Sequence, residues 1–130
     1  MKVAQTVWIT GASSGIGEAL ALTYNAKGYH TILSARRSER LASIQKRLAY
    51  PEHSYLLPLD LEQNENAEVW TNQALAFTGS IDLLINNAGM GHLGTVLEMT
   101  LPVERKVLEV NFWGCVALTK AVLPHMQKRN

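Results

Sequence analysis

The chain has 130 residues, of which 12 are Lys or Arg and 11 are Asp or Glu, so its formal net charge is +1 at pH 7. This length suits one domain of ordinary size, and a 47% share of apolar residues is enough to build a hydrophobic core. The near-neutral charge, with Lys and Arg scattered along the chain, argues against a nucleic-acid-binding surface. We expect neither a signal peptide, because Gln5 and Thr6 interrupt the apolar start, nor a membrane-spanning run.

The single cysteine, Cys115, excludes an internal disulfide bond. A lone thiol is typical of a reducing compartment, so we expect a soluble cytoplasmic protein. Cys115 falls within a predicted helix, where we expect a small, buried apolar side chain. No metal site is predicted.

The first predicted unit is a strand over residues 6–10, a glycine-rich turn and a helix over residues 14–27. Gly28 follows as a residue that readily adopts the left-handed conformation needed to end a helix. The apolar spacing predicts the following side chains on one face of the helix: Ile16, Ala19, Leu20 and Thr23. A strand that leads through glycines into a helix predicts a phosphate-binding site.

The turn reads Thr10-Gly11-Ala12-Ser13-Ser14-Gly15-Ile16-Gly17. The first amides of a helix have no intrahelical partner and carry partial positive charge, so a pyrophosphate can accept their hydrogens. Gly11 permits the sharp turn, Gly15 allows close approach of a ligand, and Gly17 lets the helix lie close to the sheet. The predicted cofactor-binding residues of this segment are Gly11, Ser13, Ser14, Gly15, Ile16 and Gly17. A glycine-rich turn without a ligand is the alternative.

The middle of the chain predicts two further strand–helix units. A strand over 30–35 precedes a helix with Ser38 as its N-cap, which ends at Tyr50-Pro51. The side chains expected to be buried on that helix are Leu41, Ile44 and Leu48. A strand over 54–59 contains Pro58, which cannot donate to a ladder and favours an edge position. A helix over 64–78 follows and ends at Gly79, with the predicted buried side chains Ala67, Trp70, Ala74 and Phe77.

A fourth strand over 83–86 is apolar on both faces, as is typical of a central parallel strand. A loop with three glycines leads to a long helix from Thr100 to about Lys128, which Pro124 is expected to kink. Alternating strands and helices predict an α/β fold with a doubly wound parallel sheet in the order 3-2-1-4.

Two arginines, Arg36 and Arg37, follow the second strand directly. A dinucleotide-binding fold usually has an acid here that binds the ribose 2′-hydroxyl, whereas a guanidinium attracts a 2′-phosphate. Ser13 can add a hydroxyl donor. This pattern predicts NADP(H) in preference to NAD(H). A solvated basic pair is the alternative, although arginine is unfavourable near a helix N-terminus.

The ends of the third and fourth strands carry further candidates. Asp60-Leu61 follows the third strand and faces the ligand crevice at a strand's carboxyl end; simple capping of the next helix is the alternative. Asn86-Asn87-Ala88-Gly89 ends the fourth strand, where Asn side chains bind neighbouring backbone and Gly89 permits close passage of the chain.

The G-x-x-x-G-x-G spacing and the Asn-Asn-Ala-Gly segment together resemble the short-chain dehydrogenase/reductase family over essentially the whole chain. The resemblance implies a Rossmann-type domain over 1–130 and hydride transfer between a nicotinamide cofactor and a small alcohol or carbonyl. It implies that Asp60 accepts a hydrogen bond from the adenine amino group. It also implies that Asn87, Ala88 and Gly89 border the cofactor. Asn111 would help to hold a water that links the catalytic lysine to solvent, while a local bend of the helix is its structural alternative.

Members of that family use a Ser, and a Tyr and a Lys four residues apart on a later helix. None of the tyrosines at positions 24, 29, 50 and 55 is followed four residues later by Lys. We therefore expect the N-terminal half of a longer enzyme, inactive alone and truncated after the fourth strand and the helix that follows it. Its exposed fourth strand predicts a homo-oligomer. A non-catalytic nucleotide-binding module or a degenerate remnant is the alternative. The glycine spacing disfavours a sugar-nucleotide epimerase.

Overall fold

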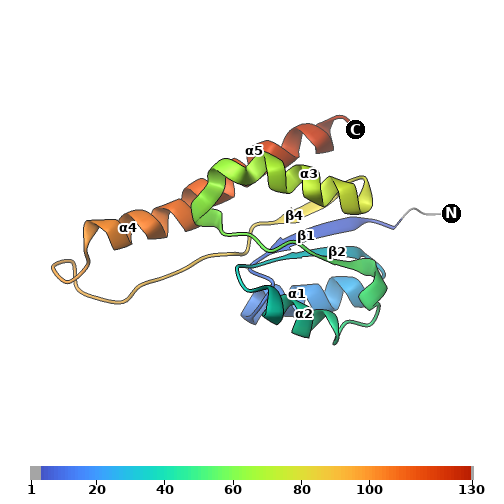
Figure 1. Ribbon diagram of the computed structural model, residues 1–130, viewed down its shortest axis with the longest axis horizontal. Helices are drawn as coiled ribbons and strands as arrows, with labels where there is room; N and C mark the ends of the chain where they lie inside the picture. Colours follow the sequence, from blue (N-terminus) through green and yellow to red (C-terminus); the bar gives the residue numbers. More distant parts are fainter. Residues whose placement is uncertain (1–3, 130) are drawn as a thin grey trace.

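Four parallel strands form one sheet in the order β3-β2-β1-β4, which confirms the predicted strand order. The computed structural model describes residues 4–129 (Figure 1). The strands are β1 (Thr6–Thr10), β2 (His30–Ser34), β3 (Ser54–Leu56) and β4 (Leu83–Ile85). Trp8 of β1 pairs with Ile32 of β2 and Leu84 of β4, so β1 is an inner strand of the sheet, between β2 and β4.

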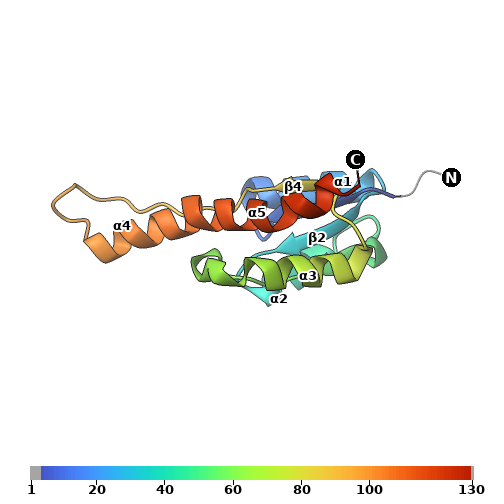
Figure 2. The ribbon, with the colours of Figure 1, turned by 90° about the horizontal axis from the view of Figure 1, so that it is seen from above.

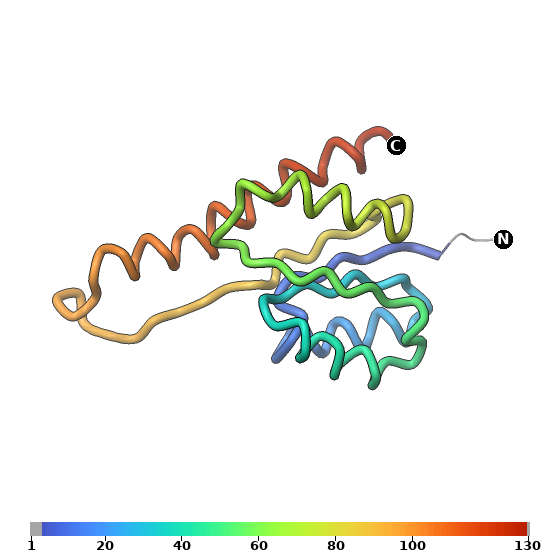
Figure 3. Tube along the Cα trace, in the orientation of Figure 1, coloured from blue at the N-terminus to red at the C-terminus, as the bar shows by residue number. Residues whose placement is uncertain are grey.

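Helices cover both faces of this sheet, as Figures 1 and 3 show. The helices α1 (Gly15–Ala26) and α2 (Ser38–Gln45) lie on one face, and α3 (Ala67–Thr78) and α5 (Gly114–Gln127) lie on the other. Every residue of β1 is buried, because side chains from both faces of the strand enter a core. Val7 and Ile9 pack toward α1 and α2, whereas Trp8 packs toward α3 and α5.

The face that α1 buries differs from the predicted one. Ile16 is 72% exposed, and the buried residues of the helix are Gly17, Ala21 and Asn25. The backbone comes too close at Gly17 to admit a side chain, and this contact sets the rotation of the helix. The Asn25 amide is buried because it bonds Tyr50 in both directions, accepting from its N–H at 2.7 Å and donating to its carbonyl at 2.9 Å.

Several element boundaries also differ from the predictions. The third strand ends at Leu56, but the Leu57 and Leu59 amides still donate to the carbonyls of Leu33 and Ala35, so Pro58 lies between two such bonds at the sheet edge, where its missing N–H is tolerated. Arg37 is the N-cap of α2 and Ser38 its first residue. The predicted helix over 64–78 is a 3₁₀ segment, η2 (Leu61–Asn66), followed by α3. Phe77 is 39% exposed because its ring lies against Tyr55 at a centroid distance of 5.1 Å and not inside the core.

The fourth strand is apolar but only partly buried, and it forms an exposed edge of the sheet, as predicted. Leu83 is exposed, and Leu84 and Ile85 are half-buried. Within the described residues β4 pairs with β1 alone, so one side and part of each face remain open. An apolar composition alone does not distinguish such an edge from a central strand.

The C-terminal helix is continuous but irregular. It consists of α4 (Leu101–Leu108), the π-helical segment η3 (Glu109–Trp113) and α5. Figure 2 shows α4 and the preceding loop extending away from the sheet. Pro124 lies within α5, which continues to Gln127. Cys115 is half-buried, so the prediction of a buried thiol is wrong.

The expectation that the chain holds no membrane-spanning run is wrong when a helix is judged by its length and composition alone. The 27-residue helix Leu101–Gln127 contains an 18-residue window with a mean hydropathy of 1.3, long and apolar enough to cross a membrane. Mostly buried core helices of soluble proteins meet the same criteria, but only 17% of this window is buried. Here α5 packs against α3, with Leu118 and Val122 buried between them and the sheet.

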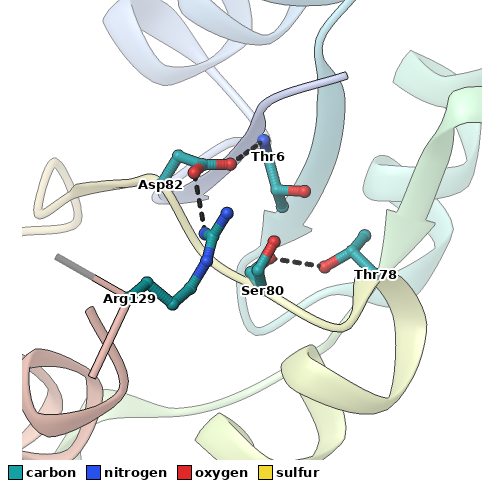
Figure 4. A network of polar contacts seen from close by, with 5 residues as sticks. All are labelled: Thr6, Thr78, Ser80, Asp82 and Arg129. Atoms are coloured by element: carbon teal, nitrogen blue, oxygen red, sulfur yellow. Dashed lines mark hydrogen bonds and ion pairs between the residues drawn. The ribbon is translucent and has the colours of Figure 1, made fainter. Parts of the chain in front are cut away.

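A polar network joins the end of the C-terminal helix to the amino-terminal edge of the sheet (Figure 4). The Asp82 carboxylate accepts a hydrogen bond from the Thr6 amide at 2.7 Å and pairs with the Arg129 guanidinium at 2.8 Å. Beside it, the Thr78 hydroxyl donates to the Ser80 carbonyl at 2.8 Å. These contacts position β1 and β4 at the edge opposite the candidate site.

Candidate functional site

A cleft of about 410 Å³ lies at the carboxyl ends of the strands, and we call it the strand-end cleft. Every cofactor-binding residue predicted from the sequence lines it except Gly17. The structure thus brings together the glycine turn, the arginine pair, Asp60-Leu61 and the segment 87–89, while their binding roles stay predictions. Residues that also line the cleft but were not predicted are Ala35, Leu59, Met90 and Val110.

The glycine turn leaves the start of α1 open toward this cleft. Gly11 and Gly15 have φ of +65° and +55°, a left-handed conformation that side chains disfavour. A Cβ on Gly15 would meet nothing within 4 Å, whereas a Cβ on Gly17 would lie 2.0 Å from the Gly11 carbonyl oxygen. Ser14 is the N-cap of α1, and its side chain makes no capping bond. The first-turn amides of α1 are therefore directed to a ligand or to solvent.

A buried hydroxyl connects the glycine turn to the end of β4. Thr10 Oγ1 accepts hydrogen bonds from the Asn87 amide at 3.1 Å and the Ala88 amide at 3.0 Å, and it donates to the Ile85 carbonyl at 3.3 Å. Asn87 Nδ2 donates in return to the carbonyls of Thr10 and Gly11, each at 3.2 Å. Thr10 was not predicted as a site residue, although a polar residue at the end of an apolar strand is a signal for one.

Basic side chains surround the outer part of the cleft. Arg36 and Arg37 are both exposed and both line it. Arg40, in the first turn of α2, donates to the Ser13 carbonyl at 3.4 Å. Among the described residues that line the cleft, Asp60 is the only acid. The region beyond β2 therefore attracts an anion.

Asp60 lies four residues beyond β3, because the strand ends at Leu56 and not at residue 59 as predicted. It is the N-cap of η2, where Oδ1 accepts a hydrogen bond from the Glu62 amide at 3.0 Å. The capping role is thus observed. A carboxylate has further acceptor positions, so capping leaves it able to accept from a second donor in the cleft.

Asn111 lies in the middle of η3, and its side chain faces the loop after β4. Its Oδ1 accepts from the Met90 amide and its Nδ2 donates to the Met90 carbonyl, both at 2.7 Å. The Gly114 amide reaches back five residues to the Glu109 carbonyl, the bond that defines a π-helix. The helix is therefore locally irregular at Asn111, and a π segment is common at functional sites. The water-holding role of Asn111 stays a prediction.

The loop after β4 contains a small structured turn that the sequence analysis missed. The Thr95 amide donates to Glu98 Oε2 at 2.8 Å, the reciprocal half of a Thr-x-x-Glu capping box. Two hydrogen bonds from Thr95 hold the pKa of the Glu98 carboxyl below its usual range. The bond from the backbone amide has the larger effect and the bond from the side chain the smaller. The Thr-x-x-Glu spacing was the available signal.

Comparison with known proteins decides the family. Residues 5–130 match the short chain dehydrogenase family. The chain belongs to this family. Dehydrogenase/reductase SDR family member 7 of Homo sapiens is 42% identical over 128 residues, a match that covers 95% of this chain and 38% of that protein. Dehydrogenase/reductase SDR family protein 7-like of Drosophila melanogaster is 42% identical over 132 residues, covering 96% and 40%.

Solved short-chain dehydrogenases share the fold. A short-chain dehydrogenase from Streptomyces avermitilis has a TM-score of 0.90 at 37% identity, covering 98% of this chain and 46% of that one. A metagenomic short-chain oxidoreductase in complex with NADP has a TM-score of 0.90 at 28% identity, covering 96% and 57%. The chain thus spans about two fifths of the length of the curated relatives.

We expect Thr10→Val to destabilise the chain by about 2 kcal/mol or more, because two amides that the hydroxyl now satisfies would lose their partner. Thr10→Ser keeps the hydroxyl and is the matched control, expected to lose less than about 1 kcal/mol. Urea unfolding of the three proteins at one concentration measures the difference. Equal stability of the two variants would contradict the role assigned to the Thr10 hydroxyl.

Proposed function

We propose that this chain forms the nucleotide-binding part of an NADP(H)-dependent oxidoreductase that interconverts a small alcohol and a carbonyl compound. One observation carries the proposal: the exposed pair Arg36 and Arg37 lines the same cleft as the open start of α1. A helix N-terminus suits a pyrophosphate, and a guanidinium pair suits a 2′-phosphate. The lone thiol of Cys115 supports a cytoplasmic location as part of the same proposal.

The residues present fit such a cofactor. The space above Gly15 admits a diphosphate close to the backbone, whereas side chains are excluded at Gly11, which faces Ala88, and at Gly17, which faces the Gly11 carbonyl oxygen. Arg36 and Arg37, with Ser13, would hold the 2′-phosphate, Asp60 the adenine amino group, and the segment 87–89 the nicotinamide side. The bound nicotinamide would supply the hydride chemistry.

Two solved relatives support the choice of cofactor. The metagenomic short-chain oxidoreductase was solved with NADP. An alcohol dehydrogenase from Thermococcus sibiricus, 31% identical with a TM-score of 0.88, covers 96% of this chain and 54% of that one and was solved with 5-hydroxy-NADP. The alcohol or carbonyl substrate is proposed from the family alone.

Calorimetric titration with NADPH and NADH tests the cofactor preference. We expect the wild-type chain to bind NADPH more tightly than NADH. Arg36→Ala/Arg37→Ala should weaken NADPH binding about tenfold or more and leave NADH binding unchanged, because a charge-assisted bond to phosphate is lost only for NADPH. Arg105→Ala, an exposed arginine outside the cleft, is the control. Equal losses for both nucleotides would refute the arginine assignment, and binding of neither would refute the proposed function.

We expect the 130-residue chain to show no carbonyl reduction of its own, because no tyrosine in it has a lysine four residues later. The same observation supports a second candidate, a nucleotide-binding module without catalysis. NADPH oxidation in the presence of aldehydes and ketones measures the activity. Turnover that is present in the wild type and lost in Arg36→Ala/Arg37→Ala would contradict this expectation, since a contaminating reductase would not respond to these substitutions.

We also propose that the chain forms a homo-oligomer. The outer side of β4 borders a groove of about 240 Å³ whose apolar lining includes Leu83, Leu84 and Leu123. Open strand edges and contiguous apolar surface favour pairing with another chain.

Light scattering at several concentrations should therefore show a dimer or a larger species. Leu83→Lys, which places a charge at the strand edge, should shift the population toward monomer. Arg105→Ala, outside this groove, should not change the mass. A wild-type chain that stays monomeric at every concentration would refute this proposal.

A further inference from the structure

The π segment η3 contacts both ends of the strand-end cleft. On one side Asn111 binds the backbone of Met90, and Val110 itself lines the cleft. On the other side the Glu109 carboxylate accepts a hydrogen bond from Asn64 at 2.9 Å. Five consecutive residues therefore connect the loop after β4 with the turn that begins at Asp60.

The backbone before Asp60 is held at the sheet, where the Leu59 amide donates to the Ala35 carbonyl at 3.1 Å, while the contact with η3 holds the residues after Asp60. The 3₁₀ segment η2 begins with a bond from the Gln63 amide to the Asp60 carbonyl at 2.9 Å, but Gln63 has a non-helical φ of −93° and ψ of 49°, so regular helical bonding does not continue through the turn. Asn64 Nδ2 donates to the Leu61 carbonyl at 3.3 Å as well as to Glu109. One amide group thus connects the backbone of Leu61 to η3.

Close packing of Gly114 against Leu61 supports the position of the turn in addition to the hydrogen bond between Asn64 and Glu109. A Cβ on Gly114 would lie 2.8 Å from the Leu61 Cβ and 2.9 Å from the Leu61 carbonyl oxygen, so the two backbones are in direct contact. An exposed ion pair between Lys106 and Glu62, at 3.4 Å, adds a third connection between the helix and the turn. Leu61 is buried between these contacts, whereas Asp60 precedes it and lines the cleft.

We infer that Asn64 and Glu109 are positioning residues for recognition of the adenine ring, an inference that rests on the proposed binding of NADP(H). Neither residue lines the cleft, so both act through the backbone of Leu61 and the carboxylate of Asp60. Their hydrogen bond places the Asp60 acceptor where the adenine amino group enters. Loss of the bond frees the turn to move, and the acceptor then no longer meets that amino group.

A merely structural contact and a positioning contact differ in what they change. A general loss of structure weakens the binding of every nucleotide by the same factor. A displaced Asp60 weakens the binding of only those nucleotides that carry the adenine amino group. The affinity ratio of NADPH to its purine analogue, in which a hydrogen replaces that amino group and N1 stays an acceptor, therefore separates the two roles.

The test is calorimetric titration of the 130-residue chain with both nucleotides. In the wild type we expect NADPH to bind about tenfold more tightly than the analogue, the value of one hydrogen bond to a charged acceptor. In Asn64→Ala the ratio should fall to about twofold or less. Glu109→Ala should give the same reduced ratio, whereas Glu109→Gln should retain the wild-type ratio because its amide oxygen still accepts from Asn64.

Asn66→Ala is the matched control. Its amide donates only to the nearby Gln63 carbonyl, at 3.2 Å, and has no hydrogen bond to η3 in the described structure. We expect its ratio to equal that of the wild type. Should Asn64→Ala unfold, the ratio in Glu109→Ala decides the question by the same criterion.

The outcomes distinguish this inference from the proposed function. A wild-type ratio in Asn64→Ala or Glu109→Ala, with both nucleotides bound, overturns the positioning role and leaves NADP(H) binding intact. Equal wild-type affinity for the two nucleotides overturns recognition of the amino group, and with it the inference. A wild-type chain that binds neither nucleotide overturns the proposed function itself.

Discussion

The geometry of the strand-end cleft depends on one buried hydroxyl, that of Thr10. Because β1 pairs with strands on both sides and is buried throughout, its carboxyl end has a fixed position. From there Thr10 Oγ1 accepts the amides of Asn87 and Ala88, and Asn87 returns two bonds to the backbone of Thr10 and Gly11. The glycine turn and the end of β4 are thus held at one separation. A ligand that spans them meets a preformed site.

The order of the strands could be predicted from the sequence, while the orientation of individual elements could not. Alternating strands and helices and the buried apolar β1 limit the topology strongly. The exposed face of α1 was misassigned because helical periodicity locates an apolar stripe, whereas the contact of Gly17 with the Gly11 carbonyl oxygen sets the rotation. The exposed edge at Leu83 was predicted from the resemblance to the family and not from composition, since apolar runs at an edge and in the centre of a sheet have the same composition.

The candidate site was predictable where residue type alone carries the chemistry. Glycines in a strand-to-helix turn and arginines after a strand are such cases, and the structure places both in one cleft. Thr10 and Val110 were missed because their positions depend on segments that meet only in the folded chain. The π segment was missed for a related reason: a bond from Gly114 to Glu109 has no signature in residue type, although Asn111 marked the helix as irregular.

The distribution of charge explains how one cleft can treat two parts of a nucleotide differently. Arg36 and Arg37 are exposed, so salt screens their attraction for an anion, and each contributes a modest amount that depends on ionic strength. Asp60 is half-buried and already accepts a hydrogen bond from the Glu62 amide, which orients its carboxylate. In the proposed complex with NADP(H), phosphate selection would weaken with added salt and would tolerate arginine motion. Base selection would instead depend on an acceptor held at one place, so contacts far from the nucleotide would alter it.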